Sequence, residues 1–250
     1  MKSIKSIKSI KSLNVHHIIQ TTRGVYALYI FWALMVLGIS LAVQVLLWIF
    51  TGDVYLSGRE PGALVRGPGQ IFMLIIGIVT GIYAISFFIR QGVTRLNFLW
   101  GTILAACAIA LSLQILGIIL HLISLGLGQV FSLHFADPSA EIGALSSLGV
   151  QTLANILVFL VFFAMGWIIG LSFYRFRLIA GLASILAGLF LMSTISSLWG
   201  QGFEFVIPGL RLPRIQNPGV FTAFGITLVS LVGQFGILYG LIRKMPVKVQ

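Results

Sequence analysis

Residues 71–98 read IFMLIIGIVTGIYAISFFIRQGVTRLNF, an apolar run without Asp, Glu, Lys or Arg from Ile71 to Ile89 that ends at a short basic turn. A helix that crosses the roughly 30 Å hydrocarbon core of a bilayer needs about 20 apolar residues. The run has this length, and a second apolar run begins at Leu99. The stretch therefore predicts two membrane-spanning helices joined by a turn of a few residues.

The composition of the whole chain agrees with a membrane setting. Of its 250 residues, 58% are hydrophobic and only 8% are charged, with a mean hydropathy of +1.07, so polar side chains cannot cover a water-soluble globule. Barrel strands would alternate apolar and polar residues, but the long uncharged runs are apolar on every face. We predict an all-α, polytopic integral membrane protein with six transmembrane helices, at residues 25–50, 71–89, 99–124, 148–173, 178–198 and 220–242.

The charges predict the orientation of this bundle. Twelve of the sixteen basic residues fall before the first span, in the second and fourth connections, or after the sixth span: Lys2, Lys5, Lys8, Lys11, Arg23, Arg90, Arg95, Arg175, Arg177, Arg243, Lys244 and Lys248. The five acidic residues, Asp53, Glu60, Asp137, Glu141 and Glu204, fall in the other loops. The positive-inside rule then places both termini in the cytoplasm. Because the bases are scattered over short turns, the net charge of +11 is explained as topogenic charge, with attraction to anionic lipid as a secondary effect, and no nucleic-acid partner is expected.

The chain divides into residues 1–24 and a single transmembrane domain, residues 25–250. The first part starts with Lys-Ser-Ile three times, which predicts a polybasic tail resting on lipid headgroups. Residues 13–26 mix apolar and polar side chains, as in a short N-terminal interfacial helix, and Gly24 could let the chain turn into the first span.

Catalytic and metal-binding motifs are missing from the sequence. There is no GxxxxGK[ST] phosphate loop, so this chain is not expected to hydrolyse ATP. Cys107 is the single cysteine, and the adjacent His16 and His17 would lie on different helix faces. His121 and His134 either anchor the chain at the interface or join Asp137 or Glu141 in a metal or proton site, although no HExxH spacing supports the second reading. We therefore expect no catalytic residue, metal or cofactor.

Polar and small residues within the spans have two readings. Five amide side chains either line a translocation path or form hydrogen bonds between helices: Gln44, Gln114, Gln151, Asn155 and Gln234. Glycines recur at helical spacing in residues 77–81, 166–170 and 181–188. Such GxxxG patterns let helices approach closely, either within one chain or across a dimer.

The basic turn is the strongest candidate for a functional contact. Gly92 can end the second span in a left-handed conformation, and Thr94 can cap a new short helix with Arg95 and Asn97 at its exposed start. Phe98 and Trp100 would hold the turn at the membrane interface. The turn would either dock into a groove on a soluble partner or serve only to set the topology.

Residues 90–98, RQGVTRLNF, followed by Trp100-Gly101-Thr102, resemble the Gly-[Val/Ala]-Thr-Arg-x-x-Phe segment of small bacterial permeases of the ABC-2 type. In that family the segment forms a coupling helix that touches the ATPase subunit. The resemblance assigns this partner-coupling role to Gly92, Val93, Thr94, Arg95, Asn97 and Phe98. One departure is the connection at residues 200–219, which holds Glu204, Arg211, Arg214 and three prolines where the family has apolar re-entrant helices.

The resemblance implies the membrane subunit of an ATP-driven exporter in the bacterial cytoplasmic membrane. Its expected partners are an ATP-binding cassette subunit and a second permease, identical or different. Its apolar spans suit amphipathic peptides, lipids or drugs as substrates. Two alternatives remain: a non-transporting membrane protein, such as an assembly factor, immunity protein or sensor subunit, and the vitamin-binding subunit of an energy-coupling transporter.

Overall fold

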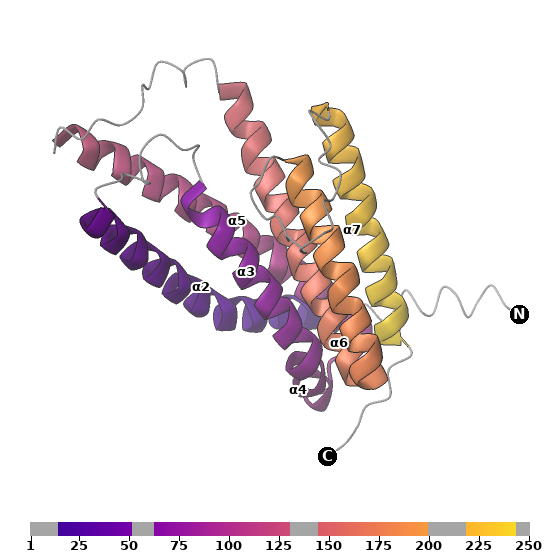
Figure 1. The fold of residues 1–250 in the computed structure, drawn as a ribbon. Helices are drawn as coiled ribbons and strands as arrows, with labels where there is room; N and C mark the ends of the chain where they lie inside the picture. The colour runs from indigo at the N-terminus through magenta and orange to yellow at the C-terminus, as the bar shows by residue number, and fades with distance from the viewer. Residues whose placement is uncertain (1–14, 52–62, 131–144, 200–218, 244–250) are drawn as a thin grey trace, which may run out of the picture.

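The computed structural model describes residues 15–51, 63–130, 145–199 and 219–243 (Figure 1). All regular structure in these ranges is helical: α2 (Val15–Thr51), α3 (Ala63–Val79), the π-helix η1 (Thr80–Ala84), α4 (Ile85–Arg90), α5 (Arg95–Val130), α6 (Leu145–Leu198) and α7 (Val220–Arg243). The basic tail, the five acidic residues, His134 and the 200–218 connection lie outside the described residues, as do the side chains of His16, His17, Gln44 and His121.

Six stretches of these helices are long and apolar enough to cross a membrane: Ile18–Ile39, Val65–Arg90, Arg95–Leu120, Gly149–Phe176, Leu178–Leu198 and Val220–Arg243. This confirms the prediction of an all-α, multi-pass membrane protein. Five of the six stretches overlap the predicted spans closely. The first begins earlier than predicted, at Ile18.

The predicted turn at Gly24 is wrong, because α2 is one helix from Val15 to Thr51. Packing against α5 explains why the helix starts before the predicted span. The hydroxyl of Thr22 donates a hydrogen bond to the backbone oxygen of Gly101 at 3.0 Å. A Cβ atom at Gly101 would lie only 2.8 Å from the Cβ of Thr21, so glycine is what lets the two helices approach. The segment read as a separate interfacial helix is thus the first part of α2.

Helix α6 contains two of the six candidate spans. Its backbone stays helical from Leu145 to Leu198, but the helix folds back on itself, so Gly188 packs against Met165 and Ile169. Figure 1 shows the pink first arm and the orange second arm running side by side in opposite directions. The fourth connection is therefore a bend near Arg175 without any loop.

The first arm of α6 forms the core of the bundle. Phe159, Phe162, Phe163 and Trp167 are completely or almost completely buried. A helix that is apolar on every face is expected in such a position, surrounded by other helices. Helices α3, α5 and α7 all contact α6.

Two glycine pairs make the closest helix crossing in the bundle's described part. Gly77 and Gly81 lie against Gly166 and Gly170 of α6. A Cβ at Gly81 would lie 2.8 Å from the backbone oxygen of Trp167, and a Cβ at Gly166 would collide with the backbone oxygen of Leu74. The expectation that these GxxxG patterns allow close approach is confirmed, within one chain.

Candidate functional site

The basic turn has the backbone geometry that its sequence predicts. Gly92 adopts a φ of +82°, in the left-handed region that glycine enters without strain. The amide of Gly92 donates to the oxygen of Ile89 at 3.0 Å, and the amide of Val93 donates to the oxygen of Phe88 at 3.2 Å. This pair of bonds is the Schellman motif, which satisfies the last carbonyl groups of α4.

Thr94 caps the next helix, as predicted. Its hydroxyl oxygen accepts a hydrogen bond from the amide of Asn97 at 3.3 Å. The prediction of a short separate helix is wrong, however, because the capped helix is α5 itself, which continues to Val130. The chain passes directly from the turn into the third span.

The turn is held on the core by Phe98. The ring of Phe98 is fully buried, with its centroid 5.6 Å from that of Phe88 and 5.9 Å from that of Trp167. Asn97 is only 1% exposed, so the expected exposed position of Asn97 is wrong, and Phe98 lies in the core and not at an interface. One helical turn beyond the cap, side chains on this face of α5 point into the bundle. The exposed part of the turn is formed by Arg90, Gln91, Gly92 and Thr94.

Arg95 has a partner that the sequence could not reveal. Its guanidinium group donates a hydrogen bond to the backbone oxygen of Arg243, the last residue of α7, at 3.3 Å. Arg175, in the bend of α6, donates in the same way to the oxygen of Leu241 at 3.3 Å. Cations at a helix C-terminus satisfy its free carbonyl groups and interact favourably with the helix dipole. Two separate connections thus hold the end of α7.

We call this end of the bundle, with the 91–94 turn, the α6 bend and Arg243, the basic end. Arg23, Arg90, Arg95, Arg175 and Arg243 belong to it. The sequence predicts that these arginines lie on the same side of the membrane. The hydrogen bonds from Arg95 and Arg175 to the end of α7 are consistent with this prediction.

The amides proposed for a translocation path lie at two different depths in the bundle. Gln114 and Asn155 are each 1% exposed, and by helix rise they lie about 28 Å and about 31 Å from Arg95 and Phe176 at the basic end. Gln70, also buried, lies at a similar depth on α3. Gln234, at 3% exposed, is only about 13 Å from the end of α7.

Gln151 is half-buried, and the side chain of Gln44 lies outside the described residues. The amide groups of Gln114 and Gln234 have no hydrogen-bond partner among the described residues. A buried amide without a partner is costly, so both residues need water or a rearranged helix contact to be satisfied.

The described part of the chain contains no cluster of side chains suited to bind a metal ion. No group of three His, Cys, Asp or Glu residues comes together there. Cys107 is a free, half-buried thiol in the third span.

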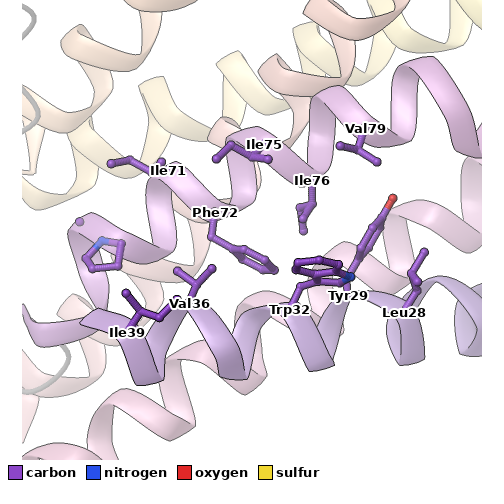
Figure 2. A pocket seen from close by; sticks show the side chains of 12 residues that line it. Leu28, Tyr29, Trp32, Val36, Ile39, Ile71, Phe72, Ile75, Ile76 and Val79 are labelled. Carbon is purple, nitrogen blue, oxygen red and sulfur yellow. The ribbon is translucent and has the colours of Figure 1, made fainter. Parts of the chain in front are cut away.

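An apolar groove lies between α2 and α3, and sequence reasoning did not predict it. It has a volume of about 830 Å³ and follows both helices over several turns (Figure 2). Its position depends on how two helices diverge, which no single helix pattern encodes.

Comparison of the chain with protein-family models, with curated proteins and with solved structures finds no match in any of the three.

Proposed function

We propose that this chain is the membrane-spanning permease subunit of an ABC-2-type exporter, with ATP hydrolysis in a separate subunit coupled through the 92–98 turn. The observation that carries the proposal is the hydrogen bond from Arg95 to the last residue of α7. It joins the turn between the second and third spans directly to the sixth span. A force on the turn would therefore act on three spans at once.

The rigid geometry of the turn suits this role. The Schellman motif and the Thr94 cap fix the backbone, and Phe98 ties the start of α5 to Trp167 in the centre of the bundle. A partner would meet Arg90, Gln91, Gly92 and Thr94, which are exposed. Asn97 and Phe98 would transmit motion inward and would not touch the partner.

A crosslinking experiment tests the proposed partner. A photoactivatable crosslinker is attached to Gln91→Cys in a Cys107→Ser background, in cells that express the native neighbouring genes. Gln91 is exposed. We expect capture of a soluble protein that contains a phosphate loop and whose ATPase activity changes when this chain is present.

The matched control is Phe221→Cys, because Phe221 is 93% exposed at the opposite end of α7. It should capture no ATPase. Equal capture at both positions, or no ATPase at position 91, would contradict the proposal.

A non-transporting membrane protein is the second candidate, and one observation favours it. The buried amides of Gln114, Asn155 and Gln234 lie within helix interfaces, as they would in a bundle that conducts nothing. Purification of a stable chain that never associates with an ATPase, from cells expressing the native neighbourhood, would support this candidate.

A further inference from the structure

The groove between α2 and α3 has an apolar rim and an apolar floor. Leu28 and Trp32 on α2, and Ile75 on α3, are about half exposed along the rim. Phe72 and Ile76 are buried in the floor. Figure 2 shows Phe72 and Ile76 of α3 pointing toward Trp32 and Val36 of α2 across this space.

A hydrogen bond closes the groove at one end. The hydroxyl groups of Tyr29 on α2 and Thr80 on η1 lie 2.9 Å apart. The hydroxyl of Thr80 donates to the backbone oxygen of Ile76 at 2.6 Å, so the hydroxyl of Tyr29 donates to Thr80. On the other side of this bond, Gly24 of α2 lies near the ring of Phe88 on α4. At the opposite end, near Ile39, Gly67 and Pro68, no hydrogen bond between the described residues of the two helices closes the groove.

The groove has the length and depth of one lipid leaflet. From Leu28 to Ile39 it is about 16 Å long, half of the roughly 30 Å hydrocarbon core. Val79 lies about 16 Å along the helix from Arg90, so the closed end is near the middle of the membrane. Both walls belong to candidate spans, Ile18–Ile39 and Val65–Arg90, so the surroundings of the groove are hydrocarbon.

We propose that this groove binds one acyl chain of a membrane phospholipid from the leaflet farther from the basic end. The chain enters past Ile39 and Pro68, lies against the rings of Trp32 and Phe72, and ends at the Tyr29–Thr80 hydrogen bond. The proposal does not depend on the export function.

The test uses the full chain in vesicles of phosphatidylcholine and phosphatidylglycerol. The probe is a phosphatidylcholine with a photoactivatable diazirine at the end of one acyl chain, which reports on the middle of the membrane. After illumination, labelled residues are mapped by mass spectrometry. We expect labelling at Leu28 and Val79 severalfold above that at Leu186 and Val232, which are exposed at a similar depth on α6 and α7.

A groove-filling variant makes the test specific. Ile75→Phe places a larger side chain in the groove, and because Ile75 is 52% exposed the helix core is not overpacked. It should cause a severalfold loss of labelling at Leu28, whereas the control Leu186→Phe should not. Even labelling of all four positions would mean ordinary bilayer contact and would overturn the proposal. Disulfide formation between two Ile75→Cys chains together with absent lipid labelling would mean that a second copy covers the groove, which would also overturn it.

Discussion

A single methyl group at Gly166 would collide with the backbone oxygen of Leu74, because the glycines of α3 and η1 cross those of α6 with almost no space between the backbones. We predict that Gly166→Ala destabilises the protein by about 1–3 kcal/mol, the usual effect of overpacking. Thermal unfolding in detergent, followed by tryptophan fluorescence, measures the change.

Gly38→Ala is the control for this substitution. Gly38 is also inside a helix, but a Cβ there meets nothing within 4 Å. Alanine has the higher helix propensity, so Gly38→Ala should leave stability unchanged or raise it by up to about 1 kcal/mol. Similar melting temperatures for the two variants would show that the close crossing does not form.

The role of a single residue can be predicted from the sequence when it depends only on interactions with residues close to it in the chain. Gly92 and Thr94 act through their own backbone conformation and through an amide three residues away, so their roles in the turn can be read from the chain. The burial of Asn97 and the partner of Arg95 depend on where α6 and α7 lie. Nothing near them in the sequence carries that information.

At the scale of elements, the last turn of α7 is held by arginines from two other elements. Arg95→Gln and Arg175→Gln each remove a cation from this helix end, a loss of about 0.3–1 kcal/mol. We predict faster hydrogen exchange of the backbone amides in residues 238–243 in both variants. Arg95→Glu should have a larger effect, because a carboxylate is repelled by the helix C-terminus.

Arg23→Gln is the matched control, since Arg23 is exposed on α2 at the basic end and leaves α7 untouched. Exchange at residues 238–243 should not change in this variant. If Arg23→Gln accelerates exchange as much as Arg95→Gln, the effect is one of total charge and the two hydrogen bonds are unimportant.

The spans themselves could be predicted because each one depends on its own length and composition. The residues at which the helices begin and end were harder to predict. The start of α2 is fixed by Thr21 and Thr22 packing on Gly101, 79 residues away from Thr22 in the chain, and the α6 bend keeps helical hydrogen bonding where a loop was expected. Helix ends set by a neighbour cannot be read from one segment.

At the scale of the whole molecule, the arrangement of the helices was beyond the sequence. The glycine patterns predicted close approach, but three such patterns could pair in several ways or across a dimer. The α2–α3 groove forms because α2 packs mainly against α5, whereas α3 packs mainly against α6. The groove therefore depends on the arrangement of four helices. Binding surfaces of this kind appear only once the bundle is assembled.

The orientation of the bundle is the remaining whole-molecule expectation, and it rests on charge. The basic end should face the cytoplasm, because arginine and lysine in short loops are retained there during insertion. Single cysteines at Asp53, Asp137 and Gln91, in a Cys107→Ser background, are treated with an impermeant thiol reagent on intact cells. We expect Asp53→Cys and Asp137→Cys to react at once, and Gln91→Cys to react only after the membrane is permeabilised. The reverse pattern would place the 91–94 turn outside the cell, where no ATP-hydrolysing partner could reach it, and the proposed coupling role of Arg95 would fall with it.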